Sequence, residues 1–449
     1  MLGLCHGEKT KAKANDMIKD VIKQLIVLHQ NNIPFSLNER ETMLPLNAGQ
    51  IITIPGVRRS GKSSKMKLVV NELVKTGVPP QNILWMGFDD ERLAEMSRQE
   101  LNEILDAYRE LYPDTPLRDV YMFFDEIQDI EGWELFVMRV HKSYCQHIYI
   151  SGSNARLLSQ EIATSLRGWA LEYRTFPLSF AEYCRFRSIP TERLNEQQTV
   201  QLRLAWDDYN RYGGFPEVVL TNDNLLRDKL LQTYYNAMLF RDMVERHSVS
   251  NIGVLRYFIK RIMNNVTKPT SINSIYNDIR SQGLKISKDE LYKWIDYLCE
   301  SFMFIRVPRY TKSLIAEETG LKKYYFIDNG MRQSILLPQS LDDGKLLESS
   351  VLLHLCRMCG ELEKVTYFMN DRECDFVLQH EEQVLQLIQV CWQMDDAETR
   401  EREICGLLEA HKVTLCDNLT IVTHHQEETI ERDGVTINVM PAWKWMLMR

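Results

Sequence analysis

A short segment of the chain, Gly56-Val-Arg-Arg-Ser-Gly61-Lys62-Ser63, has the residue types that bind phosphate groups. It fills the P-loop pattern G-x-x-x-x-G-K-[ST], in which glycines let the backbone wrap closely around the ligand with its N–H groups inward. Lys62 would reach the β- and γ-phosphates, and the Ser63 hydroxyl would ligate Mg²⁺, which prefers oxygen. The segment therefore predicts an Mg-ATP site. The residues expected to contact ATP in this loop are Gly56, Val57, Arg58, Arg59, Ser60, Gly61, Lys62, Ser63 and Ser64.

Two carboxylates follow the apolar run at residues 120–124 and could complete such a site. Asp125 would hold the Mg²⁺ together with Ser63. Glu126 would polarise an attacking water as general base, a role that hydrolysis needs and that simple phosphate binding does not. An acidic pair at a strand end is also common on protein surfaces. The P-loop in the same chain favours the catalytic interpretation, with Lys62 and Glu126 as catalytic residues.

Three further polar residues have open roles. Asn154 follows the apolar run at 147–151, where it would either sense the γ-phosphate, and so belong to the ATP-binding residues, or cap the next helix. Arg58 and Arg59 are not required by the loop pattern. They could contact phosphates, a neighbouring subunit or a carboxylate.

The elements that must position these residues can be read from the hydrophobic pattern. Apolar runs bounded by polar residues predict strands at 50–55, 83–88, 120–124 and 147–151, with helical patterns between them. Strands that alternate with helices indicate a parallel sheet covered on both faces. Before this region, residues 16–31 predict an amphipathic helix that begins at a capping Asp16.

The second half of the chain has a different pattern. Residues 180–265 are helical, interrupted by a turn at Tyr212-Gly-Gly-Phe-Pro216, and residues 271–311 then give helix, turn, helix and strand, the order of a winged helix. Its second helix begins at a capping Ser287. A small α/β domain follows, with a helix at 346–359, strands at 365–368, 374–378 and 384–390, a charged helix, and a final strand at 420–423.

Composition limits the class of protein. The 449 residues are 44% hydrophobic and 26% charged, which is globular and too long for one small core. No run reaches the roughly 18 apolar residues that cross a bilayer, and the ten cysteines are scattered, so we expect a cytoplasmic protein that does not use a membrane as partner. A net charge of −8 disfavours a protein that coats nucleic acid through bulk attraction.

Beyond the P-loop, the order of motifs resembles AAA-like ATPases of bacteria and archaea that end in a domain similar to the restriction-endonuclease fold. The resemblance covers nearly the whole chain and implies a RecA/AAA-like sheet with an Mg-ATP site. It also implies that Arg167 meets the γ-phosphate as a sensor or as a finger toward a neighbouring subunit, with a surface arginine as the alternative. Trp169 stands where the family usually has a further arginine. The motifs that carry the resemblance are Gly56–Ser63, Phe88–Leu93, Phe124–Gln128, Ser151–Asn154, Ser165–Gly168, Phe176–Phe180, Tyr212–Pro216, Arg241-Asp242, Phe326–Gly330, Glu348, Glu373–Asp375 and Gln389–Cys391.

These patterns together predict five regions. They are an N-terminal helix and linker (1–48), an α/β P-loop core (49–180), a helical lid or linker (181–265), a winged-helix region (266–335) and a small α/β restriction-endonuclease-like domain (340–449).

Nuclease chemistry of the restriction type needs an acid on one strand and an acid-x-lysine on the next. Asp375 fits the first position and Glu348 could assist, but Gln389 and Cys391 stand where the second acid and the lysine belong. We therefore expect the fold without efficient cleavage. Glu348, Glu373 and Asp375 would then mark a binding surface, or Glu373 and Asp375 would simply be the outward residues of a strand.

DNA binding through the winged helix is an alternative to a structural or protein-contacting role. The second helix, residues 287–300, carries four acids against two lysines and would repel a phosphate backbone. A structural or protein-contacting module is therefore favoured. Basic residues that would allow contact through the wing lie beside it at Arg306, Arg309, Lys312, Lys322 and Lys323.

The favoured function is ATP hydrolysis that repositions the C-terminal modules on a DNA or protein partner, with oligomerisation as an option. The main alternative is an ATP-gated adaptor or DNA-binding protein with little turnover. A small-molecule kinase is disfavoured because no acceptor-binding lid is recognisable, and a nuclease ranks last.

Overall fold

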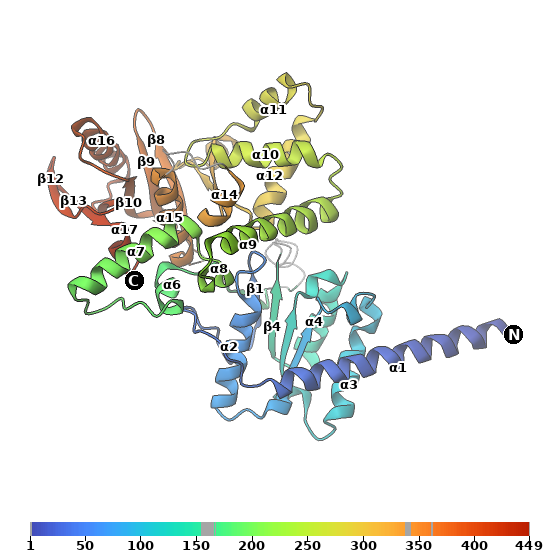
Figure 1. Cartoon of the computed structure of the whole chain (residues 1–449). Helices are drawn as coiled ribbons and strands as arrows, with labels where there is room; N and C mark the ends of the chain where they lie inside the picture. The colour runs from blue at the N-terminus through green and yellow to red at the C-terminus, as the bar shows by residue number, and fades with distance from the viewer. Residues whose placement is uncertain (1, 154–165, 167, 337–342, 361, 449) are drawn as a thin grey trace. The chain divides into compact units, whose positions relative to one another are not determined.

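The computed structural model describes residues 2–153, 166, 168–336, 343–360 and 362–448. The chain forms two compact units, Met1–Thr175 and Phe176–Arg449 (Figure 1). Among the described residues, no helix has both the length and the apolar character needed to span a bilayer. Asn154 and Arg167, two of the residues expected at the nucleotide site, lie outside the described residues.

The first unit is built on a five-stranded parallel sheet with the order β2-β3-β4-β1-β5. This confirms the predicted α/β class and fits a RecA/AAA-like fold. Its strands are β1 (Ile51–Pro55), β2 (Ile83–Gly87), β3 (Tyr121–Asp125), β4 (His147–Gly152) and β5 (Ala170–Glu172), and its helices are α1 (Leu2–Asn31), α2 (Lys62–Lys75), α3 (Asn102–Leu111) and α4 (Trp133–Ser143).

Both faces of this sheet are covered, as the continuous apolar strands predict. Side chains alternate between the faces, so Ile52 of β1 packs with Val69 and Val70 of α2, whereas Ile51 belongs to the core formed with α1, α3 and α4. Figure 1 shows α2 on one side of the strands and α3 and α4 on the other. Because the strands are parallel, the loops that follow them, including the P-loop after β1, lie at the edge of the sheet that bears the strand C-termini.

Two features of this unit differ from the predictions. The first helix begins at Leu2 rather than after Asp16, and the short edge strand β5 was not anticipated. The strand order, which was not predicted, does not place the strand that ends in Asp125 next to β1. Strand β4 lies between β1 and β3, so residues at the end of β4 stand between the P-loop and the acidic pair.

The second unit contains helices, a two-stranded sheet and a six-stranded sheet. The helical character predicted for residues 180–265 is confirmed. Its helices are α6 (Phe180–Phe186), α7 (Glu196–Tyr212), α8 (Pro216–Leu220), α9 (Asn224–Ala237) with a π-helical continuation (Met238–Glu245), α10 (Ile252–Asn264), α11 (Ile272–Ser281), α12 (Lys288–Glu300), α13 (Leu314–Thr319), α14 (Asn329–Ile335), α15 (Asp343–Met358), α16 (Ala397–Thr414) and α17 (Ala442–Trp445). Its strands are β6 (Phe304–Pro308), β7 (Lys322–Phe326), β8 (Glu363–Met369), β9 (Glu373–His380), β10 (Gln383–Cys391), β11 (Leu419–Thr423), β12 (Glu428–Arg432) and β13 (Val435–Pro441).

The region predicted as a winged helix has the expected element order. Helices α11 and α12 are followed by the antiparallel pair β6 and β7, and the Ser287 side chain caps α12 by accepting a hydrogen bond from the Glu290 N–H. This order does not by itself establish a winged helix. The division of the second half into separate domains therefore stays a prediction.

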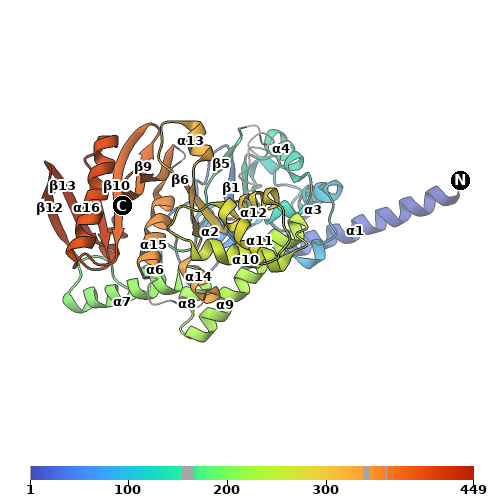
Figure 2. The same cartoon turned by 90° about the horizontal axis from the view of Figure 1, so that it is seen from above.

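The C-terminal sheet is mixed, with the order β12-β13-β11-β10-β9-β8. Helix α15 packs in the core on one face, and α16 packs in the core on the other (Figure 2). The strand predicted at residues 420–423 is present as β11, but it is not the final strand, since β12 and β13 follow it. Asp433 and Gly434, which join them, both have positive φ, and an Asp-Gly pair of this kind is a strong hairpin signal that sequence reasoning overlooked.

Two glycine-containing motifs of the second unit meet in its core. The Asp328 carboxylate accepts hydrogen bonds from the backbone N–H groups of Gly214 and Met331 at 2.8 and 2.9 Å. A Cβ atom on Gly213 would lie 2.1 Å from that carboxylate, and one on Gly330 would lie 2.0 Å from the Tyr212 carbonyl oxygen. Both positions thus require glycine, because Gly330 lies directly against the Tyr212 backbone and Gly213 lies directly against the Asp328 carboxylate.

Burial raises the pKa of Asp328 to about 6, although these backbone N–H groups oppose the shift. Between pH 4 and 6 the folded chain therefore binds a proton that the unfolded chain has released, and stability falls as pH rises through this window, by up to about 3 kcal/mol. We expect Asp328→Asn to remove this pH dependence. Amide hydrogen exchange of residues 210–216, corrected for the intrinsic exchange rate at each pH, measures this stability. If stability changed equally with pH in wild type and in Asp328→Asn, Asp328 would not be the group responsible.

Candidate nucleotide site

The P-loop lies between β1 and α2, as the sequence pattern requires. Gly61 and Arg59 have φ values of 96° and 66°, the left-handed region that glycine adopts freely and arginine does not. A Cβ atom on Gly56 would lie 2.2 Å from the Thr175 carbonyl oxygen, so this position admits only glycine without a backbone shift. The loop is therefore held in a fixed, partly strained conformation.

Lys62, the first residue of α2, is buried with its ammonium group inside the site. Its Nζ donates a hydrogen bond to the Val57 carbonyl oxygen at 3.3 Å and lies 3.2 Å from Glu126 Oε1. The side chain is only 4% exposed. The P-loop lysine and the second acid of the predicted pair are therefore brought together, although 64 positions separate them in the chain.

Asp125, at the end of β3, is buried and hydrogen-bonded to two serines. The hydroxyl groups of Ser151 and Ser63 both donate to its carboxylate. Burial raises the pKa of Asp125, while these hydroxyls and Lys62 oppose the rise. The two residues expected to ligate Mg²⁺, Ser63 and Asp125, are thus in direct contact.

Glu126 follows in an unusual backbone conformation, with φ 55°. Burial would raise the pKa of its carboxyl, but Lys62, the Gln128 amide and Arg58 outweigh burial and lower the pKa to about 2. Gln128 Nε2 donates to Glu126 Oε2 at 2.7 Å. Glu126 is therefore a carboxylate over the whole physiological pH range, which is the protonation state that a general base needs.

Ser151 was not among the predicted site residues. It lies on β4, accepts a hydrogen bond from the Glu126 N–H at 3.2 Å and donates to Asp125, so it orients both acids. The sequence signal was its position at the end of a predicted strand, three residues before Asn154. Its hydrogen-bond partners, however, depend on β4 lying between β1 and β3. Gln128 belongs to the Phe124–Gln128 motif, and nothing in the sequence indicated its hydrogen bond to Glu126.

Other P-loop residues differ in their surroundings. Val57 is buried, Ser64 is half-buried on α2, and Arg58 lies close enough to Glu126 to lower its pKa. The Ser60 hydroxyl, like that of Ser153 on the neighbouring strand end, is buried and has no hydrogen-bond partner among the described residues. Two orphaned hydroxyls are consistent with a site that completes its hydrogen bonds with a polar ligand.

The residues present fit a magnesium ion. A serine hydroxyl and a carboxylate in contact supply the oxygen donors that Mg²⁺ prefers, and phosphate oxygens and water would supply the rest. Within the part of the chain that the structure describes, no group of three or more His, Cys, Asp or Glu side chains is arranged to hold a metal by itself.

Three acids of the C-terminal domain, Glu348, Glu373 and Asp375, were expected to mark a binding surface. Glu348 and Asp375 are buried, which corrects the surface interpretation, and Lys323 is buried beside them rather than available to a phosphate backbone. Gln389 lies next to Asp375, as the alignment of the two strands predicts.

Comparisons with known proteins support the P-loop interpretation. The model of the AAA domain matches residues 48–184, which include the loop, the acidic pair and Ser151, and this match supports nucleotide binding. A domain of unknown function (DUF8612) matches residues 203–342. Among solved structures, PCH-2 of C. elegans is 13% identical and covers 52% of this chain and 63% of its own, with a TM-score of 0.29, too low a likeness to support an argument.

Two relatives match almost end to end. An uncharacterized protein of Haemophilus influenzae is 27% identical over 397 residues, covering 88% of this chain and 94% of its own. The uncharacterized protein MJ1544 of Methanocaldococcus jannaschii is 31% identical over 418 residues, covering 91% of this chain and 90% of its own. The chain therefore belongs to the family of MJ1544, with which it aligns over almost its whole length.

Proposed function

We propose that the protein binds ATP with Mg²⁺ and hydrolyses it. The observation that carries this proposal is the convergence of Lys62, Asp125 and Glu126 at one edge of the parallel sheet. A P-loop alone would support phosphate binding. The carboxylate of Glu126, ionised and held beside the P-loop lysine, adds the base that hydrolysis requires.

Each residue has a distinct role in this proposal. The loop N–H groups and Lys62 bind the β- and γ-phosphates, while Ser63 and Asp125 hold Mg²⁺, which neutralises phosphate charge. Glu126 accepts a proton from the attacking water. When triphosphate binds, Lys62 moves its contact from Glu126 toward phosphate, which frees that carboxylate. Arg167 and Asn154 stay proposed as γ-phosphate contacts.

The second half is proposed to transmit nucleotide state to a DNA or protein partner, with the protein acting in the cytoplasm. A protein is favoured over DNA as the partner, because α12 is acidic and would repel a phosphate backbone. Its acids are Asp289, Glu290, Asp296 and Glu300. Duplex DNA added to the ATPase assay tests the alternative. An unchanged rate together with unchanged DNA mobility in a gel removes DNA as the partner.

Lys62→Ala tests the proposed nucleotide site. Loss of the ammonium group removes the main charge opposite the phosphates, so phosphate release should fall by at least roughly 10²-fold and ATP binding should weaken. The matched control is Lys75→Ala, an exposed lysine on the same helix whose side chain pairs only with Glu72 among the described residues. ATP binding by calorimetry and Mg-dependent phosphate release are the measurements.

The same experiment separates the two functional classes. Wild-type protein that binds ATP but releases phosphate no faster than Lys62→Ala would be an ATP-gated adaptor. Wild-type protein that does not bind ATP at all would contradict both. Because Lys62 also compensates the partly buried Glu126, thermal unfolding of the variant must show that its first unit is still folded.

A further inference from the structure

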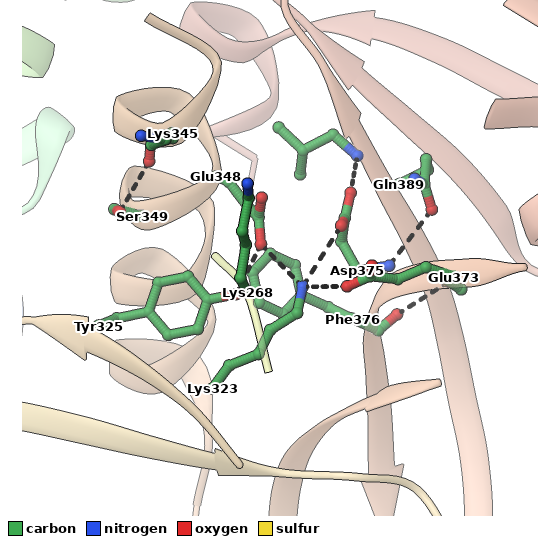
Figure 3. Close-up of polar contacts among 12 residues, drawn as sticks. Lys268, Lys323, Tyr325, Lys345, Glu348, Ser349, Glu373, Asp375, Phe376 and Gln389 are labelled. Atoms are coloured by element: carbon green, nitrogen blue, oxygen red, sulfur yellow. Dashed lines mark hydrogen bonds and ion pairs between the residues drawn. The ribbon is translucent and has the colours of Figure 1, made fainter. Parts of the chain in front are cut away.

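A second convergence of charged residues lies inside the C-terminal unit (Figure 3). Lys323, on β7, extends its ammonium group into a group of three carboxylates from α15 and β9. Its Nζ lies 3.0 Å from Glu348 Oε1, 2.5 Å from Glu373 Oε1 and 3.6 Å from Asp375 Oδ1. These four residues, the Lys323 cluster, come from three elements that are distant in sequence.

The centre of the cluster is shielded from water, and Glu373 is its partly exposed member. The Lys323 side chain is 0% exposed, those of Glu348 and Asp375 are 12% and 10% exposed, and that of Glu373 is 31% exposed. Tyr325, two residues along β7, donates from its hydroxyl to Glu348 Oε1 at 2.6 Å. The Val390 N–H donates to Asp375 Oδ2 at 2.9 Å. Glu348 and Asp375 therefore each accept a hydrogen bond from a protein donor other than Lys323.

The charge balance of the cluster favours a permanently charged lysine. Burial would lower the pKa of Lys323, but Glu348 and the other acids outweigh it and raise the pKa well above its usual value. Burial raises the pKa of Glu348 and of Asp375, and Lys323 opposes the rise at both. One ammonium group thus compensates a group of acids that would otherwise hold excess negative charge.

The residues do not fit the metal that a restriction-endonuclease-like fold would imply. Gln389 stands at the position of the second acid, and both ends of its side-chain amide are hydrogen-bonded within the protein. Its Oε1 accepts a hydrogen bond from the Asp375 N–H at 3.2 Å, and its Nε2 donates one to Glu403 Oε2 at 2.5 Å. Cys391, at the position of the lysine, hydrogen-bonds through its thiol to the Gln393 carbonyl oxygen. Neither residue supplies charge toward the centre of the cluster.

We propose that the ammonium group of Lys323 is a built-in cation that occupies the place of a divalent metal among Glu348, Glu373 and Asp375. The same contacts join β7, and the two-stranded sheet to which it belongs, to α15 and β9. The cluster therefore acts as an internal ionic link within the second unit. This inference goes beyond ATP hydrolysis and does not depend on it.

Removing the lysine should uncover a metal site. Lys323→Met keeps the length and apolar stem of the side chain but removes the cation. The three acids, which are not arranged to hold a metal while Lys323 is in place, could then close around a divalent ion, which binds oxygen donors. We expect the full-length variant, without nucleotide, to bind one more Mn²⁺ than wild type, measured by electron paramagnetic resonance of free Mn²⁺. The gain should disappear in Lys323→Met combined with Asp375→Asn.

Lys322→Met is the matched control, because Lys322 is the neighbouring residue on β7 and is partly exposed, with its ammonium group hydrogen-bonded to the Glu318 carbonyl oxygen. It should bind Mn²⁺ as wild type does. A folded Lys323→Met protein that gains no Mn²⁺ would overturn the proposal.

If Lys323→Met does not fold, the proposal can still be tested with two proteins that retain Lys323, wild type and Asp375→Asn. Wild type and Asp375→Asn should then bind Mn²⁺ equally, because the native cluster needs no metal. Wild-type Mn²⁺ binding that Asp375→Asn abolishes would show a metal centre with Lys323 as its partner, and cleavage of duplex DNA in Mn²⁺ would then identify a nuclease.

Discussion

Replacing Glu126 with glutamine is expected to stop ATP turnover while leaving ATP bound. Glutamine keeps the shape of the side chain and a carbonyl oxygen for the Gln128 amide, but it cannot accept a proton from water. General-base catalysis contributes about 10²- to 10⁴-fold to a rate, so kcat should fall by this amount. The affinity for ATP should stay equal or increase, because Lys62 loses its ionic contact with Glu126 and is freer to contact phosphate.

Single-turnover phosphate release and calorimetric ATP binding on the same samples measure the two effects separately. Glu131→Gln provides the control, since it makes the same chemical change on an exposed residue five positions along the chain. An equal loss of turnover in both variants, or full turnover in Glu126→Gln, would remove Glu126 from the catalytic role. The low pKa of Glu126 also means that its protonation should not limit the rate near neutral pH.

Gly330→Ala is expected to cause the largest loss of stability among single-methyl changes in the second unit. The added Cβ would lie 2.0 Å from the Tyr212 carbonyl oxygen and 2.3 Å from its carbonyl carbon, both backbone atoms that cannot rotate away. Overpacking of this kind costs about 1–3 kcal/mol and occasionally more, and here the upper end is expected because α7 and α14 must separate.

Gly344→Ala is the matched control for this change. It lies on helix α15 of the same unit, and its Cβ would meet no atom of the described residues within 4 Å. Because alanine is the better helix former, this variant should be as stable as wild type or more stable by about 1 kcal/mol. Calorimetric unfolding of the full chain would show the difference. Unchanged unfolding of Gly330→Ala would mean that the two motifs do not pack as closely as described.

Much of the first unit could be predicted because its signals are local. The isoleucines of β1, the P-loop glycines and the helix beginning at Lys62 form one continuous segment, and its strand-loop-helix pattern is encoded by neighbouring residues. The strand before Asp125 was recognisable for the same reason. The edge strand β5 was not, because three residues of mixed polarity carry too weak a pattern.

The second unit was less predictable because its decisive contacts are long-range. The β12–β13 hairpin had a local Asp-Gly signal and could have been found. The Lys323 cluster could not, since Lys323 stands in a basic stretch that reads as exposed, and only the placement of β7 against α15 and β9 buries it.

By itself the sequence determined which chemical groups this protein has and which short segments hold them: a phosphate loop, an acidic pair and a set of strands and helices. The spacing of apolar residues and the conformational freedom of glycine are properties of a few neighbouring residues, so these features can be predicted without a structure. Only the tertiary structure decided which groups meet, placing Ser151 between the acids at the P-loop and Lys323 among Glu348, Glu373 and Asp375. Strand order and helix packing depend on burying the whole chain at once, and they determine the partner, and hence the pKa, of each charged side chain.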